Sequence, residues 1–183
     1  RKSPNYNLPS GKVINAILRH GRAASKTELQ QWQALNLHQE QAWVNEMLTN
    51  DQIVIMEDYW GTTLAWGMGH GVPRDQLEAM IQGLRTPDLA ILLHGTRFGA
   101  AVEPGHLHEE DHELANRVAE YHHKLAEVHS WCKVDANQDV ARGPAVNSRF
   151  ALAAKTDFLS RKGFIGQTVE FNLFALHRQF EHS

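Results

Sequence analysis

The amino-acid sequence predicts an α/β fold with a mostly parallel sheet, and two observations carry this prediction. Short apolar runs at 53–56, 89–93 and 131–134 have the length and composition of buried strands. Segments with helical periodicity separate these runs, and strands that alternate with helices are typical of parallel sheets. The first strand is expected to be buried on both faces, because its four apolar residues follow one another without alternation.

The first half of the chain predicts helices at 13–21, 26–50, 62–68 and 74–84. Apolar residues at helical spacing begin after Pro9 and Gly11, and the pattern stops near Gly21. Ser25 and Thr27 are possible N-caps of the long second helix. The expected buried residues of that helix are Leu29, Trp32, Trp43 and Met47.

The second half predicts helices near 96–102 and over 109–130, the latter with close to ideal amphipathic spacing. The apolar residues of this last helix are Leu114, Val118, Tyr121, Leu125 and Val128. The segment 164–171 alternates weakly, as a strand does, and could fill the place of a strand that the rest of the chain lacks.

The composition is that of an ordinary globular protein and argues against several classes. With 183 residues, 42% hydrophobic and 21% charged, the chain is most simply one domain. A net charge of −3 argues against a nucleic-acid partner, and no apolar run is long enough to span a membrane. A single cysteine, Cys132, fits a reducing compartment, so a cytoplasmic location is expected. The chain does not begin with methionine, which suggests that the natural start lies upstream.

Two carboxylates stand directly after the first predicted strand. Glu57 and Asp58 follow the apolar run and precede the aromatic residues Tyr59 and Trp60. Ligands of open α/β sheets bind outside the carboxyl ends of the strands, so these acids are candidates for metal, hydroxyl or phosphate chemistry. The alternative is a solvated turn whose acids cap the next helix.

Five short motifs stand in order along residues 4–138. They are Pro-Asn-Tyr-Asn-Leu-Pro-Ser-Gly-Lys-Val-Ile at 4–14, Glu-Asp-Tyr-Trp-Gly-Thr-Thr-Leu-Ala-Trp at 57–66, Leu-Arg-Thr-Pro-Asp-Leu at 84–89, Gly-His-Leu-His-Glu at 105–109 and Trp-Cys-Lys-Val-Asp-Ala-Asn-Gln at 131–138. Together they resemble thymidylate kinase, a family of P-loop nucleoside monophosphate kinases, in a divergent bacterial branch. The resemblance covers a domain at 1–140, implies a three-layer P-loop NTPase-like fold, and leaves 141–183 unassigned.

The resemblance implies transfer of the γ-phosphoryl group of ATP to dTMP, giving dTDP, with Mg²⁺ on the ATP phosphates. It implies catalytic roles for Glu57, Asp58 and Asn5, and Glu57 would also bind the metal ion. Substrate contacts would come from Arg1, Tyr6, His38, Tyr59, Thr62 and Trp66. Contacts to ATP would come from His106, His108 and Asn137. Family members commonly dimerise through helices, so the helix 26–50 is expected to pack against a second copy.

Two departures from the family change the expected activity. Asp58 replaces the arginine that holds the acceptor phosphate, so another cation is needed, and the candidates are Lys12, Arg19 and Arg22. The sequence contains no G-x-x-x-x-G-K-[ST]. The first strand and P-loop, roughly forty residues for one strand–loop–helix–strand unit, are therefore expected to be missing. As given, the chain is expected to be inactive, and the alternative is a non-catalytic nucleotide-binding relative or an inactive kinase fragment.

A group of histidines and acids at 106–111 offers a third hypothesis, a metal-dependent hydrolase. His106, His108 and Glu109 are suitable ligand types. A solvated polar turn and helix surface is the favoured interpretation of these residues. His122 and His129, seven residues apart, are expected to share one helix face and to have a packing role.

Overall fold

A computed structural model describes residues 1–50, 52–95, 111–135 and, for the backbone, 169–174. Within these ranges the helices are α1 Pro9–Arg19, α2 Lys26–Thr49, α3 Trp60–Gly69, α4 Arg74–Ile81 and α5 His112–Val128. The strands are β1 Val54–Glu57, β2 Leu89–His94, β3 Cys132–Asp135 and β4 Val169–Phe174. The expected helix near 96–102 lies outside the described residues.

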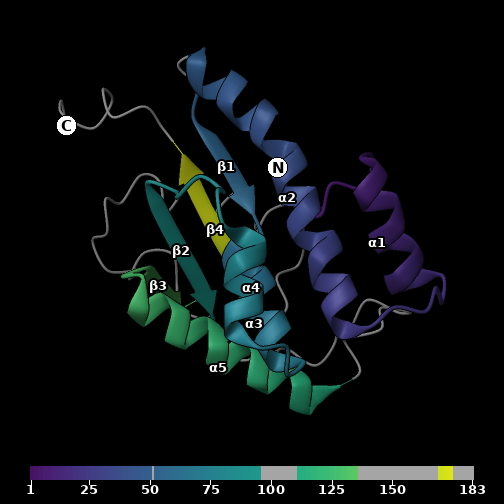
Figure 1. Cartoon of the computed structure of the whole chain (residues 1–183). Helices are drawn as coiled ribbons and strands as arrows, with labels where there is room; N and C mark the ends of the chain where they lie inside the picture. The colour runs from purple at the N-terminus through teal and green to yellow at the C-terminus, as the bar shows by residue number, and fades with distance from the viewer. Residues whose placement is uncertain (51, 96–110, 136–168, 175–183) are drawn as a thin grey trace.

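The sheet has the strand order β1-β4-β2-β3, and β4 lies between β1 and β2 (Figure 1). Strands β2 and β3 are parallel, whereas β4 is antiparallel to both β1 and β2. Three of the four strands therefore run in one direction, and the structure has the helices and small mostly parallel sheet of an α/β fold. The segment 169–174 occupies the inner position that the sequence suggested for 164–171.

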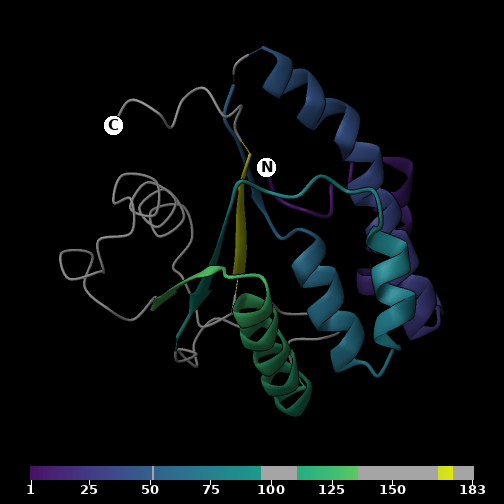
Figure 2. The ribbon, with the colours of Figure 1, turned by 60° about the vertical axis from the view of Figure 1, so that its left-hand side comes forward.

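The described helices cover one face of the sheet (Figure 2). The third layer that the P-loop fold would require is therefore not seen among the described residues. Burial along β1 agrees with this arrangement, because Val54 is 2% and Met56 0% exposed, whereas Ile53 and Ile55 are each 40% exposed. The prediction that this strand is buried on both faces was wrong, since its outward side chains keep contact with solvent.

Helix α3 is at the centre of the helical layer, packed against α5, α2 and α4. Its glycines allow close packing against the neighbouring helices. A Cβ atom at Gly67 would collide with the side chain of Leu77 on α4, and one at Gly69 with Val118 on α5. The main core lies between this layer and the sheet, and it includes Leu64, Met56 and Leu92.

Two predicted helix faces differ from the observed ones. On α2 only Leu29 of the expected stripe is fully buried, while Trp32, Trp43 and Met47 are partly buried. The buried face of α2 is Leu29, Gln30, Ala34, Asn36, Leu37, Glu40, Val44 and Leu48. On α5, Val128 at the last turn is 63% exposed, and His122 is buried instead.

Candidate functional site

The first three residues run beside the end of β1. The backbone nitrogen of Ser3 donates to the carbonyl oxygen of Glu57 at 2.9 Å, and the nitrogen of Glu57 donates to the carbonyl oxygen of Arg1 at 2.8 Å. These bonds form a short parallel bridge between Lys2 and Glu57. The bridge brings the start of the chain to the carboxyl end of the strand that the sequence had singled out.

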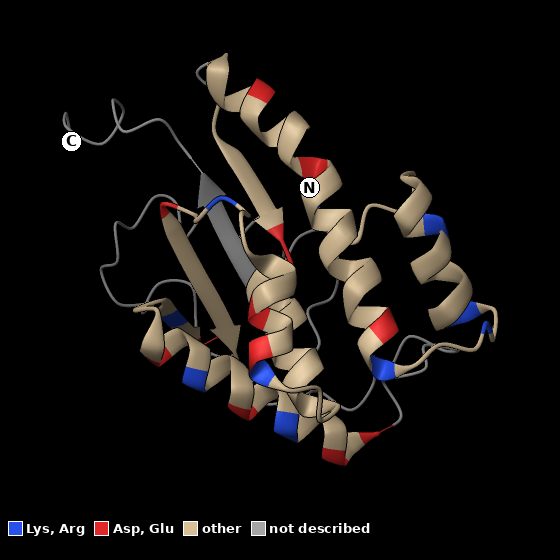
Figure 3. Cartoon of the chain, in the orientation of Figure 1, with Lys and Arg blue, Asp and Glu red and all other residues tan. Residues whose placement is uncertain are grey.

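Two carboxylates and one ammonium group meet at this end of β1, where acidic residues are red in Figure 3. The Nζ atom of Lys2 lies 3.0 Å from Oε1 of Glu57 and 4.0 Å from Oδ2 of Asp58. Both carboxylates are largely covered, with side chains 19% and 23% exposed. The group is anionic overall, because two acids share one lysine.

Asp58 has a backbone conformation that is uncommon for residues other than glycine, and the pKa of its side chain is raised. Its φ is +60°, in the left-handed region that Asp and Asn tolerate better than most residues. Burial raises the pKa of Asp58 to about 6, with Glu57 adding to the rise, against the opposing effects of Lys2 and a hydrogen bond from Thr62. That bond runs from Oγ1 of Thr62 to Oδ1 of Asp58 at 3.2 Å. Thr62 thereby belongs to the same group.

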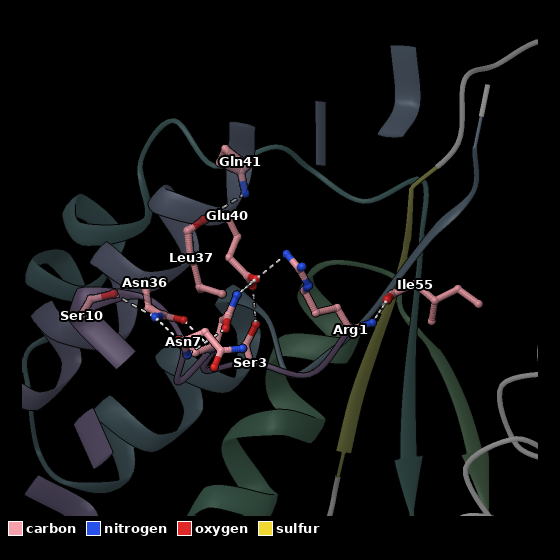
Figure 4. A network of polar contacts seen from close by, with 10 residues as sticks. Arg1, Ser3, Asn7, Ser10, Asn36, Leu37, Glu40, Gln41 and Ile55 are labelled. Carbon is pink, nitrogen blue, oxygen red and sulfur yellow. Dashed lines mark hydrogen bonds and ion pairs between the residues drawn. The ribbon is translucent and has the colours of Figure 1, made fainter. Parts of the chain in front are cut away.

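A third carboxylate, Glu40 on α2, is buried and anchors the N-terminal segment (Figure 4). Its Oε1 atom accepts from Nη1 of Arg1 at 3.1 Å and from Nδ2 of Asn5 at 2.9 Å. Oγ of Ser3 donates to the other oxygen at 3.4 Å. A buried carboxylate needs such partners, since an unpaired charge in the interior is costly.

Asn36, one turn before Glu40, completes this attachment. Its amide accepts from the backbone nitrogen of Asn5 at 2.7 Å and donates to the carbonyl oxygen of Asn5 at 3.1 Å. It also donates to Oγ of Ser10, at the start of α1, at 2.8 Å. The guanidinium of Arg1 lies 3.9 Å from the ring centroid of Trp43. Segment 1–10 is thus bound to α2 through Asn36, Glu40 and Trp43.

Tyr59 is buried in the core and is held by its hydroxyl group. The hydroxyl accepts from Nε2 of Gln41 at 3.0 Å and donates to the carbonyl oxygen of Arg85 at 3.2 Å. The nitrogen of Arg85 donates to Oε1 of Gln41 at 3.1 Å. Tyr59 therefore connects the end of β1 with α2 and with the loop before β2.

The other sequence-predicted residues are spread along the helical layer. His38 on α2 contacts α4, with Nε2 3.0 Å from the carbonyl oxygen of Met80. Trp66 is partly buried on α3 and lies near His70, with ring centroids 6.1 Å apart. Tyr6 is 38% exposed in the loop before α1. His106, His108 and Asn137 lie outside the described residues.

The structure thus brings together Glu57, Asp58 and Thr62, whereas Arg1 and Asn5 bind the neighbouring carboxylate Glu40 on α2. Sequence reasoning missed Lys2 and Glu40. A weak signal existed for Glu40, because a carboxylate stands among Asn36, Leu37 and Val44, the buried side of α2. Of the cations proposed instead, Arg22 pairs with Glu28, and Lys12 and Arg19 stand on α1.

Several other candidate residues do not belong to this group. Arg117 pairs with Glu113 on the surface of α5. Among the described residues no three His, Cys, Asp or Glu side chains are grouped to hold a metal ion. Burial lowers the pKa of His122 to about 4, and its Nδ1 lies 3.1 Å from the carbonyl oxygen of Val118, which fits the packing role.

A cavity of about 440 Å³ lies between α5 and the turn from α3 to α4. Its lining is Met68, Gly71, Val72, Arg74, Tyr121, Lys124, Leu125 and Val128. It contains none of the sequence-predicted site residues. In the described parts of the chain, no helix has the length and apolar character that crossing a membrane requires.

Comparison with known proteins gives one distant relative. No protein-family profile matches the chain. The chain is 25% identical over 139 residues to a protein of Invertebrate iridescent virus 6 named "Putative thymidylate kinase 251L". The match covers 75% of this chain and 65% of that protein, so the chain spans less than two thirds of the relative's length. This similarity supports a distant, thymidylate kinase-like relationship.

Proposed function

We propose that this protein is a nucleoside monophosphate kinase that transfers the γ-phosphoryl group of ATP to dTMP and so forms dTDP. The observation that carries the proposal is the group at the carboxyl end of β1, which lies within a chain similar to a protein named as a thymidylate kinase. Phosphoryl transfer depends on positioning and charge stabilisation more than on covalent chemistry, so a fixed group of charges is the feature required.

The residues around β1 can be given roles in this proposal. Glu57 and Asp58 face the reacting phosphates, and Asn5, Tyr6 and Arg1 stand on the segment beside them. The acceptor nucleotide binds on the side of α2 and α3, where its contacts are Tyr59, Thr62, Trp66 and His38. Residues His106, His108 and Asn137 are proposed to contact ATP.

The oxygen atoms at this site fit a magnesium ion. Mg²⁺ prefers oxygen ligands and is commonly held by one or two carboxylates together with water and substrate phosphates. Glu57 would hold it, with Asp58 and the hydroxyl of Thr62 nearby. When bound with ATP, the ion neutralises charge on the phosphates. The ammonium of Lys2, 3.0 Å from Glu57, must then find another anion.

A second candidate function is a non-catalytic nucleotide-binding relative. Strand β4 favours it, since it is antiparallel and fills the position between β1 and β2. In the kinase family the central strand runs into the phosphate-binding loop. An acid at position 58, where the family has an arginine, favours the same alternative. The domain division at residue 140, the dimer through α2 and the cytoplasmic location remain predictions.

An assay of the protein encoded by the complete reading frame around these residues tests the proposal. With ATP, Mg²⁺ and dTMP, we expect formation of dTDP, and its loss when Glu57 is replaced by Gln. A matched control is Glu46→Gln, at an exposed position of α2. Binding of dTMP without dTDP formation would favour the second candidate, and no binding of dTMP would contradict both.

A further inference from the structure

The end of β1 presents an electrostatic problem for a phosphate-bearing acceptor. Glu57 and Asp58 lie side by side, and a phosphate monoester brought there carries further negative charge. Like charges within a few ångströms repel one another strongly where water is excluded. A cation from the protein is therefore required on the acceptor side. In the part of the chain that the structure describes, Lys2 is the side-chain cation that pairs with these carboxylates.

The backbone around Lys2 is held on both sides. Toward the sheet, the bridge to Glu57 holds residues 1–3 along β1. Toward the helices, the side chains of Arg1 and Ser3 both bind the buried carboxylate of Glu40. Side chains alternate along an extended segment. The flanking residues therefore face α2, while Lys2 faces the carboxylates at the end of β1.

The side chain of Lys2 is accessible to a ligand from solution. It is 56% exposed, whereas the side chain of Glu40, which anchors its neighbours, has 0% exposure. A lysine ammonium on its flexible stem is a common partner for phosphate groups. The ammonium pairs with Glu57 at 3.0 Å and lies 4.0 Å from Asp58, so a phosphate oxygen must compete with Glu57 for it.

We propose that Lys2 binds the phosphate of the monophosphate acceptor, and that Glu40 is the positioning residue that holds Lys2 in place. This inference rests on the proposed function. Lys2 supplies the positive charge that position 58 lacks, and it does so from the segment next to β1. The alternative is that Lys2 only neutralises Glu57 and Asp58 in the folded protein, without touching a ligand.

Comparison of dTMP with thymidine separates these roles, since the two ligands differ only by the phosphate. We would measure both affinities by calorimetry for the wild type, Lys2→Met, Lys2→Arg and the control Lys124→Met, an exposed lysine of α5. Loss of one charge-assisted contact is expected to weaken dTMP about tenfold. Thymidine affinity should not change, and Lys2→Arg should keep most of the dTMP affinity.

A double-mutant cycle with Lys2 tests the positioning role of Glu40. Glu40→Gln should weaken dTMP selectively, and the double variant with Lys2→Met should show no further loss, because both changes remove the same contact. Thymidine binding by the same variants reports whether the fold is intact. Equal losses for both ligands in Lys2→Met, or dTMP affinity that neither change affects, would overturn the inference.

The outcomes also separate this inference from the proposed function. If the wild type binds dTMP and Lys2→Met binds it as tightly, the role of Lys2 is wrong and the proposed function stands. If the wild type binds neither dTMP nor thymidine, both are wrong.

Discussion

At the scale of single residues, two buried or nearly buried acids dominate the site, and they are stabilised in different ways. Glu40 has no exposed side-chain surface and has three donors, from Arg1, Ser3 and Asn5. Asp58 is 23% exposed, shares Lys2 with Glu57, and has a raised pKa. The first acid supports the structure, whereas the second costs stability when it is ionised.

Removal of the Glu40 charge should destabilise the fold. Glu40→Gln keeps the shape of the side chain but replaces one acceptor oxygen by a donor, which faces donors in a buried place. We expect the free energy of unfolding to fall by about 1–3 kcal/mol. Urea unfolding measures this, and Glu46→Gln, at an exposed position of α2, should change little. Equal effects of the two changes would contradict the role assigned to Glu40.

Asp58 makes stability depend on pH. Because folding raises its pKa from 3.8 to about 6, the folded state takes up a proton between these values. The contribution of this protonation to the free energy of unfolding is fully present below about pH 4 and is lost as the pH rises through about 6. Asp58→Asn, which also tolerates a positive φ, should therefore be more stable than the wild type by about 1–3 kcal/mol at pH 7.

Unfolding of both proteins between pH 3.5 and 8 checks this expectation, as the range covers the two pKa values. The advantage of Asp58→Asn should shrink toward zero at the acid end. A difference that does not vary with pH would mean that the pKa of Asp58 is the same in the folded and unfolded states.

At the scale of elements, the start of α1 is fitted closely to the loop before it. A Cβ atom at Gly11 would collide with the carbonyl oxygen of Asn5 and with Cα of Tyr6. These two residues stand on the segment that carries the site. The helix therefore depends on glycine at a position where alanine has the better helix propensity.

Gly11→Ala tests this contact, because helix propensity and packing predict changes in stability of opposite sign. Propensity alone would stabilise the helix by up to about 1 kcal/mol, whereas overpacking against backbone atoms costs about 1–3 kcal/mol. We expect a lower melting temperature, measured by circular dichroism, with little change in the exposed neighbour Lys12→Ala. A rise in melting temperature would show that the loop can move aside.

Sequence periodicity predicted the order of the described helices and of β1, β2 and β3, since local patterns decide such elements. It failed where burial depends on distant parts of the chain. Trp32 and Trp43 look like core residues, yet the buried face of α2 includes Asn36 and Glu40, because a polar segment packs there. The role of Lys2 could not be predicted either, since only the bridge to β1 brings it to Glu57.

At the scale of the whole molecule, the sheet is completed by a strand from the end of the chain. Strand β4 pairs with both β1 and β2, so these two strands are connected only through it among the described residues. The weak alternation near 164–171 suggested a strand but could not show its direction, because antiparallel or parallel pairing is decided by distant partners.

A proline in β4 should therefore affect the whole fold. The backbone of Asn172 pairs with Met56 on one side and with Ala90 on the other. Asn172→Pro removes a backbone donor from an inner strand and should cost about 1–3 kcal/mol or more. Asn172→Ala, which keeps the donor, is the matched control in the same urea unfolding measurement. Equal stability of the two variants would contradict the pairing of β4.

The most direct test of the account is a titration of ¹⁵N-labelled protein with dTMP, followed by amide chemical shifts. If the carboxyl end of β1 and the segment beside it form an acceptor site, the largest changes will fall in residues 1–6 and 57–62, and thymidine will change fewer of them near Lys2. Absence of any change, or changes confined to the cavity between α5 and the α3–α4 turn, would contradict the account.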